Sequence, residues 1–305
     1  MEHGISLKLV LKRSVFKRTL RLDVVAVGLL VLVQLVVLLT SSASHAGTVA
    51  KPTLLYVFAG QSNMSNGASS TTELRKEMPA MMAPQRDVLF WGPTEDTRNK
   101  RWVAMAPPTA THYVLTHSGF GPEIGAGPVL AKLHRRATIA FVKLSRPSTS
   151  LYKDWAPDNR AGAGMYALLM ADVRAAKVQM ESATHRPVIV AGFFWLQGES
   201  DAQYTGTARA YTANLEAFIR RMRLDLRSPL MPFVIGEIPQ LLPQYPRFPY
   251  CSLVQSAERA VASQVPRTFY VPTADLARSA TSPAHFSTRG IVELGRRFAN
   301  AKFSL

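Results

Sequence analysis

The stretch "PTLLYVFAGQSNMSNG" (residues 52–67) decides the fold. An apolar run over 52–60 ends abruptly in Gly60, Gln61, Ser62 and Asn63. A nearly continuous apolar run is typical of a strand buried on both faces of a parallel sheet. In open α/β sheets, ligands bind beyond the carboxyl ends of the strands. We therefore interpret Ser62 as a nucleophile held at a sharp strand-to-loop turn, where the small Gly60 lets the backbone bend.

Strand-like and helix-like segments alternate along the rest of the chain. Further apolar runs predict strands at 137–145, 187–198, 232–239 and 268–276. Amphipathic stretches predict helices at 127–137, 165–180, 211–226, 251–265 and 289–303. This alternation favours a parallel sheet with helices on both faces. We expect an α/β fold, a three-layer α/β/α sandwich with a mainly parallel five-stranded sheet.

The N-terminus resembles a targeting segment. Six Lys and Arg residues lie within residues 8–21, residues 24–39 are apolar except for Gln34, and the small residues Ser44 and Ala46 follow. This order predicts a secretory signal peptide cleaved after Ala46. The alternative is an uncleaved membrane anchor, although the apolar run is shorter than the about 20 residues that usually span a bilayer. Both readings predict export, with 1–46 as the leader and 47–305 as a single domain.

The charge does not point to nucleic acid. The 305-residue chain has a net charge of +16, and residues 47–305 alone keep about +12. The basic residues of this part are dispersed along expected helices, and no helix-turn-helix, zinc-finger or RNA-binding signature is present. We therefore expect a solvated basic surface and no nucleic-acid partner.

The chain contains one cysteine, Cys251, so an internal disulfide is excluded. Cysteine and histidine residues at zinc-binding spacing are also missing, and the sequence indicates no structural zinc. These observations fit a periplasmic or secreted protein stabilised by its core.

Residues of the kinds that serine hydrolases use in catalysis lie close to the ends of several predicted strands. Glu199 and Asp201 come after the 187–198 run, Asp275 ends the 268–276 run, and His285 precedes the last helix. A serine hydroxyl becomes a strong nucleophile when an imidazole accepts its proton and a carboxylate orients that imidazole. Each residue alone is a weak signal, but together with Ser62 they indicate a serine hydrolase.

Four motifs carry a resemblance to a known family. They are "GQSNM" (60–64), "GPE" (121–123), "WLQGESDA" (195–202) and "HFSTRG" (285–290). In this order they resemble the sialate O-acetylesterase/acetylxylan esterase domain, carbohydrate esterase family 6, of the SGNH-hydrolase superfamily. The resemblance covers nearly all of 52–303. It implies a flavodoxin-like fold and the removal of O-acetyl groups from sialic acid, xylan or an envelope glycan, with no metal or cofactor.

The resemblance also implies roles for particular residues. Ser62 would be the nucleophile and would offer its own N–H to the oxyanion, and His285 would be the general base. A second N–H would come from Gly121 or, failing that, Gly119, and Gln197 would add its side-chain amide. The supporting residues, which would orient the turn, are Gln61 and Asn63.

One departure from the family leaves the third catalytic residue open. Many relatives have an aspartate three residues before the histidine, and here that position is Ser282. The orienting acid would then be Glu199, with Asp275 and Asp201 as second and third candidates. If no acid replaces it, the alternative is a non-catalytic carbohydrate-binding or scaffold protein on a decayed esterase fold. A lipase-like or thioesterase activity, or acyl transfer to another sugar, also stays open.

Overall fold

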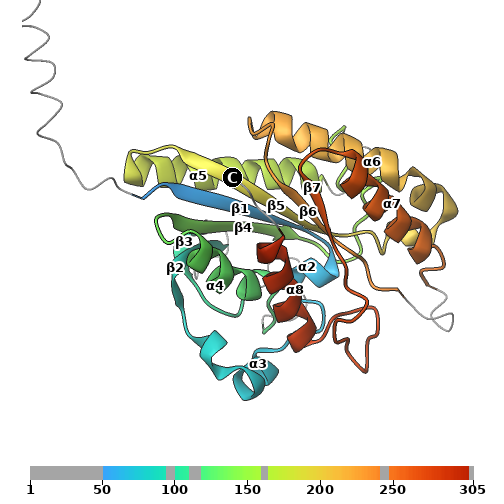
Figure 1. The fold of residues 1–305 in the computed structure, drawn as a ribbon, viewed down its shortest axis with the longest axis horizontal. Coiled ribbons are helices and arrows are strands. Elements are labelled where there is room, and N and C mark those ends of the chain that lie inside the picture. Colours follow the sequence, from blue (N-terminus) through green and yellow to red (C-terminus); the bar gives the residue numbers. More distant parts are fainter. Residues whose placement is uncertain (1–50, 94–99, 110–117, 159–163, 241–246, 302–305) are drawn as a thin grey trace, which may run out of the picture. The chain divides into compact units, whose positions relative to one another are not determined.

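A seven-stranded sheet forms the centre of the domain, in the order β3-β2-β4-β1-β5-β6-β7 (Figure 1). All neighbouring strands are parallel except β2 and β3, which are antiparallel. The strands are β1 (Thr53–Gly60), β2 (Gln85–Pro93), β3 (Lys100–Met105), β4 (Thr138–Ser145), β5 (Val188–Leu196), β6 (Phe233–Gly236) and β7 (Thr268–Val271).

The computed structural model describes residues 51–93, 100–109, 118–158, 164–240 and 247–301. All of them belong to one unit, Lys51–Leu305. The predicted leader, residues 1–46 with its apolar run at 24–39, lies outside the described residues. None of the described helices is long and apolar enough to cross a bilayer.

The mainly parallel α/β sandwich is confirmed, but the expected number of strands was wrong. β1, β4, β5, β6 and β7 coincide with the five predicted runs, whereas β2 and β3 were not expected. β3 is an edge strand whose residues are mostly exposed or half-buried. Such a strand has no continuous apolar run, because only one side of it packs against the protein.

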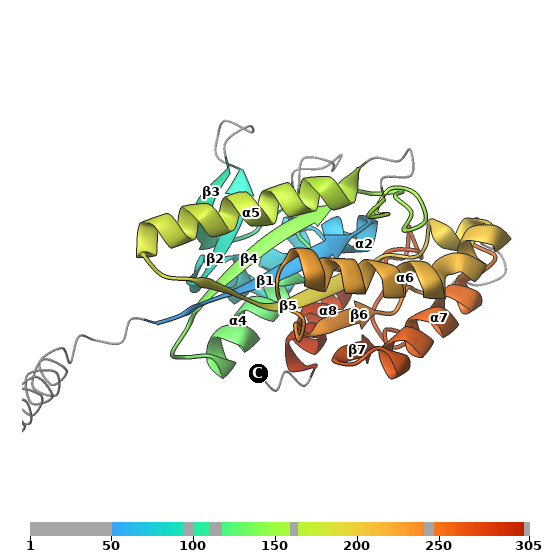
Figure 2. The same cartoon turned by 90° about the horizontal axis from the view of Figure 1, so that it is seen from above.

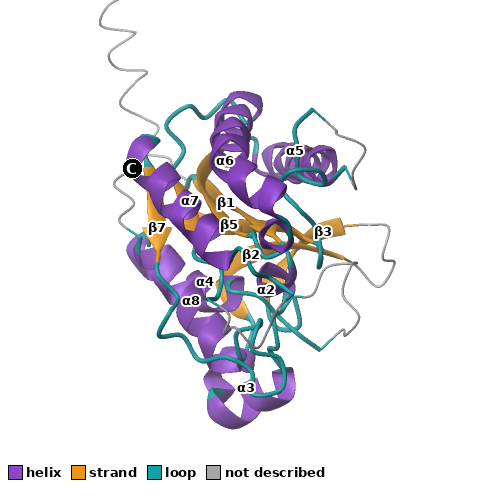
Figure 3. Cartoon of the chain, turned by 90° about the vertical axis from the view of Figure 1, so that its right-hand side faces the viewer, coloured by secondary structure: helices purple, strands orange, loops and turns teal. Residues whose placement is uncertain are grey.

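Helices cover both faces of the sheet (Figures 1, 2 and 3). One face packs against α5 (Met165–Thr184), α6 (Thr205–Asp225) and α7 (Cys251–Gln264). The other packs against α3 (Thr71–Glu77), α4 (Glu123–Leu133) and α8 (Thr288–Asn300). Alternate residues of β1 enter the two cores: Leu55 and Val57 lie in the first, Tyr56 and Phe58 in the second. Cys251, the first residue of α7, is buried in the first core.

Helices α4 and α8 cross at very close range. A Cβ atom on Gly125 of α4 would lie 2.0 Å from the Val292 carbonyl oxygen. A Cβ atom on Gly295 of α8 would lie 1.9 Å from the Pro122 carbonyl oxygen. Side chains at these positions would force the helices apart, so the two glycines set the distance between them.

The strand β1 is central in the sheet, between β4 and β5, and strands that follow it in the sequence lie on both sides. Ligand sites of open parallel sheets lie where the strand order changes direction in this way, beyond the carboxyl ends. The segment that follows β1 is a single-turn helix, α2 (Ser62–Ser65). The fold therefore places Ser62 at the expected position for a ligand site.

Candidate active site

The turn between β1 and α2 is held against the end of β5. The Gln61 N–H donates to the Leu196 carbonyl at 3.0 Å. A Cβ atom on Gly60 would lie only 2.0 Å from the same carbonyl oxygen. Only glycine permits this close approach, and it turns the chain so that Ser62 is the first residue of α2.

Three side chains form a continuous hydrogen-bonded chain. His285 Nε2 lies 3.1 Å from Ser62 Oγ, and His285 Nδ1 lies 2.8 Å from Ser282 Oγ. The His285 N–H also donates to the Ser282 carbonyl at 2.8 Å, which closes a tight turn. With a proton on Nδ1 donated to Ser282, Nε2 has a free lone pair toward Ser62. This arrangement has the geometry of a nucleophile, a base and an orienting group.

Asn63 fixes the loop that carries the histidine. Its Nδ2 donates to the Ala284 carbonyl at 3.0 Å, and its Oδ1 accepts from the Phe286 N–H at 3.1 Å. The two neighbours of His285 are therefore both held by the residue that follows Ser62. The Asn63 Nδ2 also donates to Glu199 Oε1 at 2.7 Å.

Glu199 lies at the site, but its side chain forms no hydrogen bond with the imidazole of His285; it accepts one from Asn63. The side chain is 2% exposed, and its Oε2 has no hydrogen-bond partner among the described residues. Burial raises the pKa of Glu199 to about 7, against the hydrogen bond from Asn63, which lowers it. In this structure Glu199 supports the loop of His285 through Asn63, and Ser282 is the group that bonds the ring.

The structure does not bring the other two candidate acids to His285. Asp275 forms a bidentate ion pair with Arg297, with N–O distances of 2.7 and 2.6 Å. The hydrogen bonds from Arg297 lower the pKa of Asp275 to about 2. Asp201 is buried and accepts hydrogen bonds from the N–H groups of Leu151 and Tyr152 at 2.8 and 3.0 Å. Asp201 therefore orders the loop after β4.

The side chains of Gln61 and Gln197 are buried and bonded to each other. Gln61 Oε1 accepts from Gln197 Nε2 and from the Ser200 N–H, each at 3.2 Å. Gln197 Nε2 also donates to Asp201 Oδ2 at 2.6 Å and to the Thr149 carbonyl at 2.9 Å. Gln61 thus ties the nucleophile turn to the residues that follow β5. The amide of Gln197, expected in the oxyanion hole, is engaged inside the protein because its donors face Asp201 and Thr149.

The N–H of Gly121 is also engaged. It donates to Glu123 Oε1 at 2.9 Å, so it does not point to an open position beside Ser62. Two other N–H groups, those of Ser62 and Gly119, have no acceptor among the described residues. Gly119 packs against Asn66, which lines the cavity beside Ser62.

A cavity of about 670 Å³ opens over these residues. Ser62, Ser282 and His285 line it together with Glu199. Two further wall residues, Arg247 and Phe248, were not found from the sequence. The Arg247 guanidinium lies over the Phe248 ring at 5.4 Å from its centre. One indication of their role was visible in the sequence: both lie in the segment that follows strand β6, and ligand sites lie beyond the ends of such strands.

The surroundings of His285 favour the neutral form of its imidazole. Burial lowers the pKa of His285 below its ordinary value of 6.5, and the positive charge of Arg247 lowers it further. The base form is therefore the main form at neutral pH. Among the described residues, no cluster of three or more His, Cys, Asp and Glu side chains is placed to hold a metal ion.

Comparisons with known proteins agree with this fold. The family model described as carbohydrate esterase, sialic acid-specific acetylesterase, matches residues 52–304. A search of curated proteins finds no match. Among solved structures, a protein from Arabidopsis thaliana is 20% identical with a TM-score of 0.65, covering 82% of this chain and 97% of that one.

Two further structures are similar in fold. NanS is 17% identical with a TM-score of 0.59, covering 83% of this chain and 97% of that one. A carbohydrate acetylesterase from Xanthomonas citri is 17% identical with a TM-score of 0.52, covering 81% of this chain and 55% of that one. The family match extends over most of the chain, from the start of β1 to beyond α8. The chain therefore belongs to the carbohydrate esterase family of sialic acid-specific acetylesterases, and it is a carboxylic-ester hydrolase.

Proposed function

We propose that this chain is an exported esterase that removes O-acetyl groups from a carbohydrate through an acyl-enzyme on Ser62. The observation that carries the proposal is the chain of hydrogen bonds from Ser62 through His285 to Ser282, at 3.1 and 2.8 Å, on the wall of an open cavity. The family supplies the class of bond that is cleaved.

The first half of the reaction transfers the acetyl group to the enzyme. Ser62 Oγ attacks the acetyl carbonyl carbon while His285 Nε2 takes the hydroxyl proton. The oxyanion accepts hydrogen bonds from the N–H of Ser62 and, we infer, from the N–H of Gly119. The tetrahedral intermediate then collapses, the bond to the sugar oxygen breaks, and His285 gives its proton to that oxygen. The deacetylated sugar leaves.

The second half returns the enzyme to its starting state. A water molecule loses a proton to His285 Nε2 and attacks the acetyl carbon on Ser62. Collapse of the second intermediate releases acetate and gives the proton back to Ser62 Oγ. Throughout, the Ser282 hydroxyl accepts the Nδ1–H of His285 and holds the ring. Since this hydroxyl has no charge, it stabilises the imidazolium less than a carboxylate does.

We propose an acidic sugar as the substrate. The family description names sialic acid, a sugar that carries a carboxylate. Arg247 offers a cation in the same cavity wall as Ser62, and no described carboxylate pairs with it. We propose that a substrate carboxylate pairs with Arg247, so an acetylated sialic acid should be hydrolysed better than acetylated xylan.

Acetate release tests the esterase proposal. Wild type, Ser62→Ala and the control Ser263→Ala, an exposed serine of α7, are compared on an aryl acetate, acetylated sialic acid and acetylated xylan. We expect Ser62→Ala to lose activity by about 10⁴-fold or more, with the control unchanged. Equal activity of wild type and Ser62→Ala would contradict the acyl-enzyme. Export is tested separately by finding the processed N-terminus at residue 47 by mass spectrometry.

The second candidate, a carbohydrate-binding protein on a decayed site, is motivated by Ser282 alone. The short Ser62–His285 contact argues against it, because a binding protein has no need of a base on that hydroxyl. Ser282→Asp separates the two. An inactive wild type that gains esterase activity on this substitution would favour the binding protein.

A further inference from the structure

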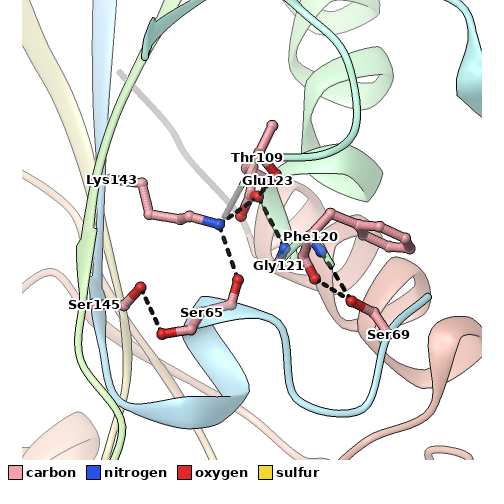
Figure 4. A network of polar contacts seen from close by, with 8 residues as sticks. All are labelled: Ser65, Ser69, Thr109, Phe120, Gly121, Glu123, Lys143 and Ser145. Carbon is pink, nitrogen blue, oxygen red and sulfur yellow. Dashed lines mark hydrogen bonds and ion pairs between the residues drawn. The ribbon is translucent and has the colours of Figure 1, made fainter. Parts of the chain in front are cut away.

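A buried ion pair lies directly beneath the nucleophile turn. Lys143, near the carboxyl end of β4, and Glu123, the first residue of α4, have fully buried side chains, and Lys143 Nζ lies 2.6 Å from Glu123 Oε1 (Figure 4). Burying two charges is costly, and a buried ion pair is often no more stabilising than apolar side chains of the same size. The position of this pair between two functional loops therefore calls for a reason other than stability.

The lysine holds the end of the nucleophile helix. Its Nζ donates to the carbonyl oxygen of Ser65 at 3.1 Å, and the Ser65 hydroxyl donates to Ser145 Oγ at 2.9 Å (Figure 4). Since α2 runs only from Ser62 to Ser65, the residue that Lys143 holds is one turn from the nucleophile. A helix this short has little stability of its own and depends on such outside contacts.

The glutamate holds the opposite loop. Its Oε1 accepts from the Gly121 N–H at 2.9 Å and from the Thr109 hydroxyl. A Cβ atom on Gly121 would lie 2.3 Å from the Met64 carbonyl oxygen of α2 and 2.6 Å from Glu123 Oε2. The glycine of the "GPE" motif is therefore required by the approach of this loop to α2 and to the carboxylate.

A second tie joins the same two segments. Ser69 Oγ donates to the Phe120 carbonyl at 2.6 Å and accepts from the Phe120 N–H at 2.9 Å (Figure 4). The chain after α2 and the loop at 119–121 are thus joined through Ser69 and through the ion pair. Gly119, whose N–H we assign to the oxyanion, belongs to this loop.

We propose that the Lys143–Glu123 pair is a positioning device, which sets the distance between Ser62 and the loop at 119–121 that carries the Gly119 N–H. The inference rests on the proposed esterase function. It assigns the two residues no contact with substrate: they act through the backbone of Ser65 and Gly121. A misplacement of about 1 Å between nucleophile and oxyanion donors costs on the order of 10²-fold in rate.

The test compares Lys143→Met, Glu123→Gln and the double variant Lys143→Met/Glu123→Leu with wild type. The control is Lys100→Met, which removes an ion pair of Lys100 with Asp172 between β3 and α5. Each variant is assayed for kcat and KM on an aryl acetate, for its pH profile, for the rate of Ser62 labelling by a fluorophosphonate, and for its melting temperature.

We expect kcat and the labelling rate to fall 10- to 100-fold in the single variants. KM should not change. The fall of activity at acidic pH, which reports the pKa of His285, should also stay at the same pH, because the variants do not alter Ser282 or His285. The double variant has no unpaired buried charge, so it should be more stable than the single variants and should still react slowly. The control should keep its kcat.

A double variant with wild-type kcat and labelling rate would overturn the inference, because the pair would then serve stability alone. This variant also decides the question if Lys143→Met fails to fold. Failure of the proposed function looks different: wild type would then release no acetate from any ester. The labelling rates would still rank the variants, since a fluorophosphonate reports on Ser62 without an ester substrate.

Discussion

At the residue scale, the group that orients the imidazole of His285 is a serine, Ser282. Its neutral hydroxyl bonds His285 at 2.8 Å, where an aspartate would put a charge. His285 must be neutral to act as a base, so activity is lost as the pH falls through its pKa. Because burial and Arg247 lower this pKa, the acid limb of the wild-type profile should lie below pH 6.5.

Ser282→Asp should raise kcat by about 10-fold or more, because the carboxylate stabilises the imidazolium. The same charge raises the pKa of His285, so the acid limb should move up by about 1 pH unit or more. The measurement is kcat/KM on an aryl acetate between pH 4 and 9. An unchanged limb would mean that residue 282 does not act on the ring.

Arg247→Gln should move the limb in the same direction by a smaller amount, because it removes a positive charge near His285. It should also lower kcat/KM for an acetylated acidic sugar by about 10-fold while sparing an acetylated neutral sugar. Equal losses on both sugars would argue against a carboxylate partner for Arg247.

Sequence reasoning identified Ser62 and His285, which the structure brings together, because each lies within a motif that has recognisable neighbours. The partner of the imidazole was not reached, because it depends on the path of the loop at 272–287. That loop folds back so that Ser282 contacts the ring, while Asp275 turns outward to Arg297. Lys143 was also missed, although a lysine within an otherwise apolar buried run was a visible signal.

At the scale of elements, apolar runs predicted the five strands β1, β4, β5, β6 and β7, and amphipathic stretches predicted the five long helices. The strand β3 was missed because most of its residues are exposed or half-buried, and α2 was missed because four residues are too few to show a helical period. The strand β2 was missed because its apolar segment, residues 88–91, is short. The close crossing of α4 and α8 was likewise invisible, since it depends on which glycines meet.

Gly295→Ala should separate these helices and destabilise the protein by about 3 kcal/mol, because the new Cβ has no space beside the Pro122 carbonyl. It should also lower kcat, because α8 follows the His285 loop and α4 follows the loop at 119–121. The control is Gly206→Ala in α6, where no atom lies within 4 Å of the new Cβ. That variant should gain about 0.5 kcal/mol. Thermal melting checks both.

At the scale of the whole molecule, Glu199 and Asp201 should contribute more to stability at mildly acidic pH than at pH 8. Burial raises the pKa of Glu199 from 4.5 to about 7 and that of Asp201 from 3.8 to about 6. The folded state therefore holds protons that the unfolded state releases. The stability they contribute is complete below about pH 4 and is lost as the pH rises through 6 to 7.

We expect the melting temperature of wild type to fall between pH 5 and 8, and that of Glu199→Gln to fall less. The amide keeps an oxygen for the bond from Asn63 but has no proton to lose. Parallel melting curves for the two proteins over this range would show that Glu199 does not titrate there.

The single cysteine offers a way to watch these events in the unmodified protein. Cys251 is the one thiol of the chain and is 2% exposed at the start of α7. A thiol reagent can reach it only when α7 leaves the sheet, so its labelling rate counts openings of the folded state. Labelling during a pH jump would separate unfolding from protonation of His285. Unfolding would raise the labelling rate of Cys251, whereas protonation of His285 would stop catalysis and leave that rate unchanged.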